Sequence, residues 1–259
     1  ADSASGQACC DPIPFKVIMK TTIVIPTYNE AENLPRLVDD LFYLPVENLN
    51  ILVVDDNSRD GTGRIAEELK RTTNGKVQVL HRAGKLGLGS AYIQGFHMAM
   101  ENGADYIGQM DADFSHPPAK VVELLAAIQD CDVALGSRYV PGGKLDERWP
   151  FWRKALSGFG NFYARTILSM PLRDVTGGFR LWRKETLAAM PLQRVKSNGY
   201  VFQVEMGYIA HLLGFKFKEI PIYFADRRWG ESKMSFRIQV EAAFRTWKLL
   251  GLYKDLRKK

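Results

Sequence analysis

The chain has 259 residues, of which 46% are hydrophobic and 25% charged, and its formal net charge is +6. These values are typical of a soluble globular domain, and no apolar run approaches the ~20 residues of a membrane-spanning helix. Three cysteines, Cys9, Cys10 and Cys131, are too few for a disulfide framework, which favours a reducing compartment. The positive charge predicts an anionic partner, namely a phosphate-bearing substrate, a membrane surface or nucleic acid.

The first half of the chain alternates between short β-branched runs and segments of helical period. Residues 22–26 and 51–55 are continuous apolar runs, as buried parallel strands require. Further elements are expected in this order: helix 32–44, helix 62–73, strand 77–81, helix 90–101, strand 106–110, helix 118–129 and strand 132–135. The alternation predicts an α/β fold in which helices flank a largely parallel central sheet.

The second half is richer in Gly, Pro, Trp and Arg, and no low-complexity linker separates it from the first. It is expected to contain helices at 151–168 and 201–213 and a strand at 217–224. We therefore divide the chain into a flexible leader or extension at 1–20, a single domain at 21–236, and an amphipathic helix with a basic tail at 237–259.

The last helix carries an apolar stripe on one side. Its members recur at helical spacing: Phe236, Val240, Ala243, Phe244, Trp247 and Leu250. Such a stripe usually packs on a protein core, but a Trp/Phe face with basic flanks also suits a membrane interface, and both interpretations stay open.

Residues 56–67 have the acidic spacing of an EF-hand calcium loop. An EF-hand loop follows a helix, whereas a strand is expected directly before this segment. We therefore interpret Asp55 and Asp56 as carboxylates at the carboxyl end of a parallel strand, where open α/β sheets bind their ligands.

A second acidic motif, Asp111-Ala112-Asp113, follows the strand expected at 106–110. Two carboxylates spaced in this way converge on one divalent cation, and hard oxygen ligands suit Mg²⁺ or Mn²⁺ bridging a diphosphate. Asp-x-Asp is also common as a solvated turn, so its weight comes from cations elsewhere in the chain. These cations have Gly, Ser or Trp neighbours, which favour phosphate binding, and they are Arg138, Arg153, Lys154, Arg227, Arg228 and Lys233. Together they predict a multiply charged phosphate substrate.

Several motifs together resemble the polyprenyl-phosphate (dolichol-phosphate type) mannosyltransferases, which have the GT-A glycosyltransferase fold. Ile-Pro-Thr-Tyr-Asn-Glu at 25–30 and Met-Asp-Ala-Asp at 110–113 are shared widely among GT-A enzymes. Gly-Ser-Arg-Tyr at 136–139, Gly-Tyr-Val-Phe-Gln at 199–203 and Gly-Glu-Ser-Lys at 230–233 are more specific to the subgroup. The resemblance extends over about residues 21–236.

The resemblance implies a donor pocket, a metal site and an acceptor site. The residues implied to bind the nucleotide sugar GDP-mannose are Pro26, Tyr28, Glu30, Val54, Asp56, Asp111, Ala112, Asp113, Arg138, Arg227 and Lys233. Mg²⁺ or Mn²⁺ is implied at Asp111 and Asp113, although Ser115 stands where some relatives carry a further Gln ligand. Arg138, Arg153 and Ser157 are implied to bind the acceptor phosphate. Asp113, Arg138 and Lys233 are implied to carry catalysis.

The implied reaction is metal-dependent, inverting transfer of mannose from GDP-mannose to the phosphate of a membrane polyprenol, which releases GDP. A phosphate monoester is already anionic near neutral pH, so the reaction needs cations to relieve repulsion rather than a catalytic base. Two alternatives stay open. One is a UDP-sugar donor, such as UDP-glucose, and the other is a non-catalytic nucleic-acid-binding protein, which the paired carboxylates disfavour.

A lipid acceptor implies a cytoplasmic protein that is peripheral on the cytoplasmic face of a membrane. Three modes of anchoring stay open. The helix at 236–250 docks on the bilayer, a small membrane-anchoring subunit holds the enzyme, or the sequence is a piece of a longer protein.

Overall fold

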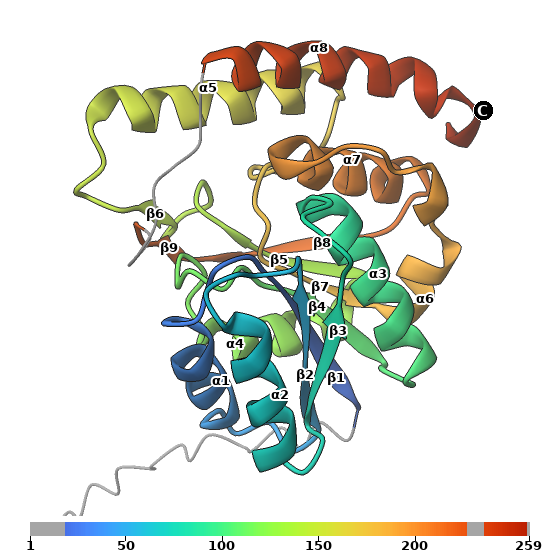
Figure 1. Cartoon of the computed structure of the whole chain (residues 1–259). Coiled ribbons are helices and arrows are strands. Elements are labelled where there is room, and N and C mark those ends of the chain that lie inside the picture. The colour runs from blue at the N-terminus through green and yellow to red at the C-terminus, as the bar shows by residue number, and fades with distance from the viewer. Residues whose placement is uncertain (1–18, 227–235, 258–259) are drawn as a thin grey trace, which may run out of the picture.

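The computed structural model of the chain describes residues 19–226 and 236–257, with side chains described for 19–226 and 243–257. A seven-stranded sheet has the order β3-β2-β1-β4-β7-β5-β8 (Figure 1). In chain order its strands are β1 (Thr21–Thr27), β2 (Leu49–Asp55), β3 (Val77–His81), β4 (Tyr106–Gln109), β5 (Val133–Ser137), β7 (Arg180–Arg183) and β8 (Phe217–Pro221). All neighbouring pairs are parallel except those of β7, which runs antiparallel to β4 and β5. The expected α/β fold with a largely parallel sheet in a single domain is confirmed.

Helices cover both faces of this sheet because its strands are apolar on both sides. Ile23 and Ile25 of β1 pack in a core with α1 (Leu34–Phe42), α2 (Thr62–Thr72) and α4 (Lys120–Ala127). Val24 points to the opposite face, where α3 (Leu88–Glu101), α6 (Lys184–Ala189) and α7 (Gly199–Leu212) form a second core. The strictly alternating direction of side chains along a strand explains this division.

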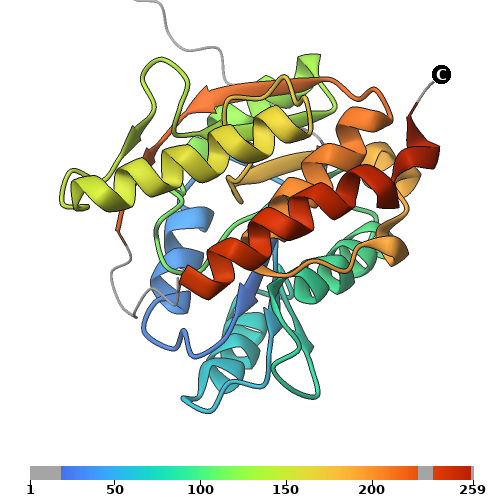
Figure 2. The same cartoon turned by 90° about the horizontal axis from the view of Figure 1, so that it is seen from above.

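Two long helices form a further layer outside α7. They are α5 (Phe151–Ile167) and α8 (Phe236–Leu252), and they lie together above the rest of the molecule (Figure 1). Seen from above, they run side by side over the domain (Figure 2). The inner side of this layer is apolar, since Ala164, Leu168 and Leu249 belong to the core beneath it. The predicted C-terminal helix therefore packs on the domain through part of its surface.

Two elements near the middle of the fold are absent from the sequence-based prediction. These are β7, which lies between β4 and β5, and the short helix α6 that follows it. Arg180 and Arg183 are the first and last residues of β7, so only two apolar residues lie between them, too few to predict a strand from the sequence. The predicted strand at 217–224 is also divided, because β8 ends at Pro221 and β9 (Tyr223–Phe224) pairs instead with β6 (Lys144–Leu145).

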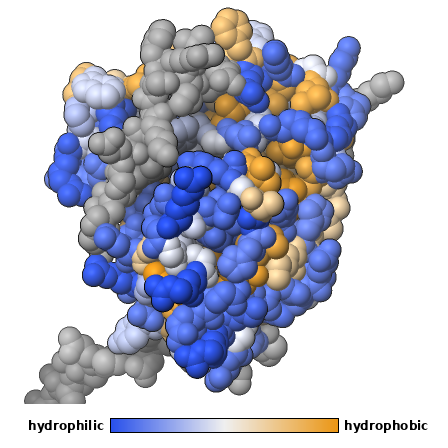
Figure 3. Space-filling view, in the orientation of Figure 1, coloured by the Kyte–Doolittle hydropathy of each residue, from blue (hydrophilic) through white to orange (hydrophobic). Residues whose placement is uncertain are grey.

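The visible surface is hydrophilic over most of its lower part, and hydrophobic side chains gather toward the top (Figure 3). Within the part of the chain that the structure describes, no helix combines the length and apolar composition needed to cross a membrane.

Candidate active site

The loops that follow β1 and β2 are held together by the acidic residues that imitate a calcium loop. The Asp60 carboxylate accepts hydrogen bonds from the backbone N–H groups of Ala31 (3.0 Å) and Thr62 (3.0 Å). Burial opposes ionisation, but these bonds and one from the Thr62 hydroxyl lower the pKa of Asp60 below its ordinary value. Ser58 donates to Asp55 and accepts from the Asn29 N–H at 2.9 Å. The segment follows strand β2, as predicted when the EF-hand was rejected, and several of its carboxylate oxygens accept hydrogen bonds from protein groups.

Asp56 forms a buried ion pair rather than an open carboxylate. Its Oδ1 accepts a short hydrogen bond from Arg82 Nη1, and its Oδ2 accepts one from the Gly87 N–H at 3.1 Å. Arg82 also donates to Ser90 Oγ (2.6 Å) and Gln94 Oε1 (3.1 Å) on α3. Arg82 was not predicted, although its position directly after β3 puts it at the same edge of the sheet as Asp56.

The other residues expected to meet the nucleotide differ in accessibility. Pro26, Tyr28 and Glu30 are half-buried at the end of β1, and the Lys85 ammonium lies 3.6 Å from the centroid of the Tyr28 ring. Val54 is different, because its side chain is fully buried in the core beneath α3. Only the backbone of Val54 is therefore compatible with the role expected for it.

The Asp-x-Asp motif lies just beyond β4, on a backbone that the protein holds firmly. Tyr92 Oη donates to Asp111 Oδ1 at 2.9 Å, and the Asp111 N–H donates to His116 Nδ1 at 3.0 Å. Burial and the adjacent Asp111 raise the pKa of Tyr92 well above its usual value, so this hydroxyl stays a donor. Burial lowers the pKa of His116, so its ring stays neutral and accepts.

The turn after Asp113 is strained. Phe114 has φ = 61°, a left-handed conformation that is uncommon for a bulky residue. It brings the Ser115 N–H to 3.0 Å from Asp113 Oδ1, while the Ser115 hydroxyl is buried with no hydrogen-bond partner in the described structure. Ala112 between the two carboxylates is also buried.

The residues present fit a divalent cation that is shared with a substrate. Across residues 19–226 and 236–257, no group of three or more His, Cys, Asp or Glu side chains is arranged to hold a metal. The protein therefore offers the two carboxylates Asp111 and Asp113, and the unpartnered Ser115 hydroxyl lies close by in sequence. Mg²⁺ is commonly bound in this way, through one or two carboxylates together with substrate phosphates and water.

Arg138, at the end of β5, is held in a buried ion pair with Asp174. Its Nε and Nη2 donate to the two carboxylate oxygens of Asp174 at 2.7 Å each, and its backbone N–H donates to the same side chain at 3.0 Å. Nη2 also donates to Thr176 Oγ1 at 2.6 Å. Although burial opposes both charges, the pairing raises the pKa of Arg138 and lowers that of Asp174. Asp174 was not predicted, since nothing in the local sequence distinguishes it.

The other two residues expected at the acceptor site, Arg153 and Ser157, lie in the first half of α5. Ser157 and Tyr139 share a hydrogen bond between their hydroxyl oxygens at 2.9 Å. Arg153 lies over the Trp149 ring, 3.7 Å from its centroid, and donates to Asp226 at 3.2 Å. The structure thus brings three residues of the expected acceptor site to one region, whereas Arg227 and Lys233 lie outside the described residues.

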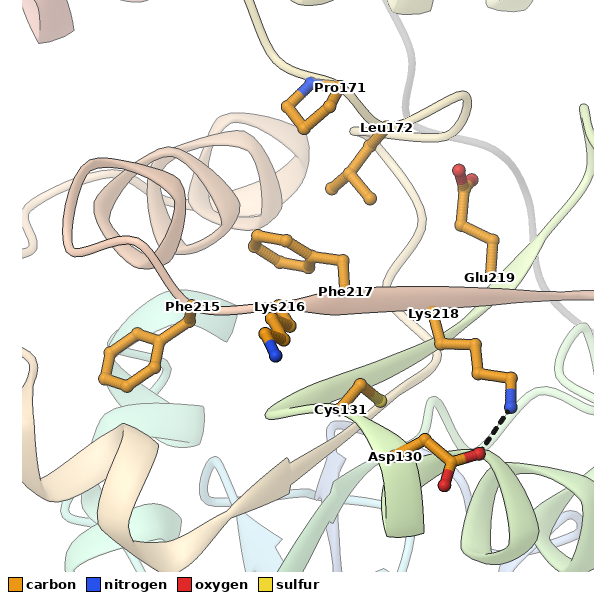
Figure 4. A pocket seen from close by; sticks show the side chains of 9 residues that line it. All are labelled: Asp130, Cys131, Pro171, Leu172, Phe215, Lys216, Phe217, Lys218 and Glu219. Carbon is orange, nitrogen blue, oxygen red and sulfur yellow. Dashed lines mark hydrogen bonds and ion pairs between the residues drawn. The ribbon is translucent and has the colours of Figure 1, made fainter.

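A separate open pocket lies at the other end of the same sheet. Figure 4 shows its lining side chains, which include Asp130, Cys131 and Phe217. Most of them come from the segments at the amino ends of β5 and β8, and Pro171 and Leu172 come from the segment after α5. The carboxylates and Arg138 of the expected site lie at the opposite, carboxyl ends of β2, β4 and β5. The pocket is therefore distinct from the candidate active site.

Residues 22–190 match the model of glycosyl transferase family 2. A polyprenol monophosphomannose synthase of Mycolicibacterium smegmatis is 42% identical over 93% of this chain and 91% of its own length. An undecaprenyl-phosphate mannosyltransferase of Micrococcus luteus is 44% identical over 92% of this chain and 98% of its own.

Solved structures agree with this fold at much lower identity. Mannosyl-3-phosphoglycerate synthase from Rubrobacter xylanophilus has a TM-score of 0.63 at 15% identity, over 93% of this chain and 76% of its own. Glucosyl-3-phosphoglycerate synthase from Mycobacterium tuberculosis, solved with Mn²⁺, UDP-glucose and phosphoglyceric acid, has a TM-score of 0.59 at 15% identity, over 92% and 80%. The family match and the two relatives together show that this chain is an enzyme of glycosyl transferase family 2, similar over most of its length to polyprenyl-phosphate mannosyltransferases.

Proposed function

We propose that this glycosyltransferase transfers mannose from GDP-mannose to the phosphate of a membrane polyprenol, with inversion at the anomeric carbon. The observation that carries the proposal is the juxtaposition of two kinds of group at one edge of the sheet. A carboxylate pair, Asp111 and Asp113, follows β4, and cationic and hydroxyl side chains gather around Arg138 at the end of β5. The names of the two relatives support the class of acceptor and the sugar.

The donor side rests on the loops after β1, β2 and β4. In this proposal Tyr28 and Glu30 contact the nucleoside, and the Asp56–Arg82 pair fixes the loop that lies beneath it. Asp111 and Asp113 would hold Mg²⁺ or Mn²⁺ next to the donor diphosphate. When bound, the metal supplies positive charge that stabilises the departing diphosphate. Two hydrogen bonds hold Asp111 in place: Tyr92 binds its side chain, and His116 binds its backbone N–H.

The acceptor side rests on Arg138, Arg153 and Ser157. Their positive charge and hydroxyl bind the lipid phosphate and reduce its repulsion from the anionic donor. One oxygen of this phosphate then attacks the anomeric carbon of mannose as the bond from that carbon to the GDP oxygen breaks. The attacking oxygen needs no base, because the monoester is ionised near neutral pH. Arg227 and Lys233, expected on the donor diphosphate, remain part of the proposal.

The location of the enzyme follows from this acceptor. We place it at the cytoplasmic face of a membrane as a peripheral protein, and a small anchoring subunit remains an additional hypothesis. The alternative of a non-catalytic nucleic-acid-binding protein is rejected, because the chain belongs to a glycosyltransferase family.

The test is a donor and acceptor panel. Purified protein is incubated with radiolabelled GDP-mannose or UDP-glucose, with and without a short polyprenyl phosphate, in Mg²⁺, Mn²⁺ or EDTA. We expect label from GDP-mannose in the organic phase only when lipid phosphate and a metal are both present. Transfer from UDP-glucose alone would refute the donor, and turnover that ignores the lipid would refute the acceptor.

A further inference from the structure

The largest exposed apolar side chains of the described chain concentrate on the outer layer of the fold. Six aromatic residues, which we call the α5–α8 face, belong to it: Phe151, Trp152, Phe159, Phe162, Phe244 and Trp247. Their exposed fractions run from 54% for Trp247 to 85% for Phe151. Isolated exposed apolar residues are ordinary, but a contiguous group of this kind marks a contact with another surface.

Helical geometry puts the aromatic residues of α5 on one side. At 100° per residue, Phe151, Trp152, Phe159 and Phe162 fall within about 100° of arc around the helix axis. Ser157 and Ala164 fall on the opposite side, where Ser157 contacts Tyr139 and Ala164 enters the core. The helix thus packs on the domain through one side and presents aromatic rings on the other.

The two helices are fastened to each other. Trp247 Nε1 donates to Tyr163 Oη at 2.7 Å, and Tyr163 Oη in turn donates to the Ala243 carbonyl at 3.4 Å. Figures 1 and 2 show α5 and α8 as neighbours in the outermost layer, and hydrophobic side chains appear in the same upper region in Figure 3. The exposed rings of both helices therefore form a single surface.

The charge around this surface identifies what it meets. The segment 151–167 contains no acidic residue, and its Lys154 and Arg165 lie next to the aromatic arc, whereas Arg153 lies on the packed side, where it pairs with Asp226. On α8, the exposed Arg245 and Lys248 flank Trp247. Rings of Trp and Phe beside Lys and Arg suit the interface of an anionic bilayer, where the rings enter the acyl boundary and the cations meet lipid headgroups.

We propose that the α5–α8 face docks on the surface of an anionic lipid bilayer. This inference rests on the proposed function, which it deepens by naming the surface that brings the enzyme to its acceptor. An amphipathic helix lies with its apolar side about 5–10 Å into the interface, and a helix is about 10–12 Å across. Ser157, on the other side of α5, then lies near the level of the headgroups, where a lipid phosphate is found.

The experiment measures binding to vesicles that contain no polyprenyl phosphate. The full chain is sedimented with vesicles of phosphatidylcholine alone or mixed with phosphatidylglycerol. The test variant is Phe151→Ser/Phe162→Ser, and the matched control is Tyr43→Ser, which removes a ring that is 92% exposed at the end of α1. We expect the wild type and the control to bind the anionic vesicles and the double variant to bind about tenfold more weakly or worse.

Further measurements separate this inference from the proposed function. The double variant should keep the wild-type melting temperature and the wild-type rate with a short acceptor dispersed in detergent. If no variant or wild type transfers mannose at all, the proposed function fails while the vesicle result still stands. The docking inference is overturned if the wild type does not bind vesicles or if the double variant binds as well as the wild type. It is also overturned if sedimentation velocity shows a wild-type dimer that the double variant dissolves.

Discussion

The buried pair of Arg138 and Asp174 permits a sharp test, because the surface of the same protein carries a pair of matching geometry. Replacing Asp174 with Ala removes three hydrogen bonds of 2.7–3.0 Å to Arg138 and leaves its guanidinium buried without a counter-charge. Breaking a buried pair in this way costs about 3–5 kcal/mol. The negative charge of Asp174 also stabilises the charged form of Arg180, which is buried and whose pKa is lowered by that burial to about 10.

For a domain of this size, a loss of about 1 kcal/mol lowers the melting temperature by roughly 2–4 °C. We therefore expect Asp174→Ala to melt about 6–20 °C below the wild type in calorimetry or circular dichroism. A loss of that size is a large part of the roughly 5–15 kcal/mol that stabilises a typical domain. Asp174→Asn, which keeps the side-chain shape, provides a milder variant for assays of acceptor binding, where we expect a raised KM for polyprenyl phosphate.

The control is Asp255→Ala. Arg194 donates to both carboxylate oxygens of Asp255, at 2.7 and 2.9 Å, but the two side chains are 34% and 59% exposed. Water replaces this partner, so we expect the melting temperature to stay within error of the wild type. The reasoning from burial would be refuted if Asp174→Ala were as stable as the wild type, or if both variants lost the same stability.

Three further predictions concern the metal, the glycines and acid stability. Asp113→Asn should reduce mannosyl transfer at least about a hundredfold in either Mg²⁺ or Mn²⁺ with little change in melting temperature, and retained activity would remove Asp113 from the site. Gly89→Ala should lower the free energy of unfolding, measured by urea denaturation, by about 1–3 kcal/mol, because the new methyl group would collide with the Ser197 carbonyl oxygen. Gly160→Ala on α5 meets open space and should raise the free energy of unfolding by ~0.5–1 kcal/mol. Equal effects of the two changes would contradict the close packing at Gly89. Because the pKa of folded Asp60 lies below the ordinary value of ~3.9, its contribution to stability is complete above that pH and is lost as the pH falls through the folded pKa. Urea midpoints from neutral pH to about pH 3 should therefore fall less steeply for Asp60→Asn than for the wild type, and superimposable curves would refute this role.

Local patterns in the sequence were sufficient to predict strands and helices where apolar residues repeat with the period of that element. The apolar runs that became β1 and β2 are continuous because both faces of the sheet are covered, and the segments between them repeat at helical spacing. The acidic motifs were found for the same reason, since a carboxylate directly after a buried strand is visible in the sequence. The resemblance of several short motifs then indicated the family.

Local patterns failed where a charged residue is buried by a distant partner. Arg180 lies in the core and opens β7, so a residue type typical of the surface concealed a central strand. Arg138 was singled out as a phosphate-binding residue, but its partner Asp174, which lies 36 residues away, was not predicted. Asp56 was expected in the nucleotide pocket, and its ion pair with Arg82 was not predicted.

The sequence by itself determined the alternation of strands and helices, the edge of the sheet that carries the carboxylates, and the family, because each depends on neighbouring residues. Only the tertiary structure decided which charges are paired inside the protein and which rings stay outside on α5 and α8. The physical reason is that an ion pair or an exposed face depends on which segments meet in space, and residues far apart in the chain decide that.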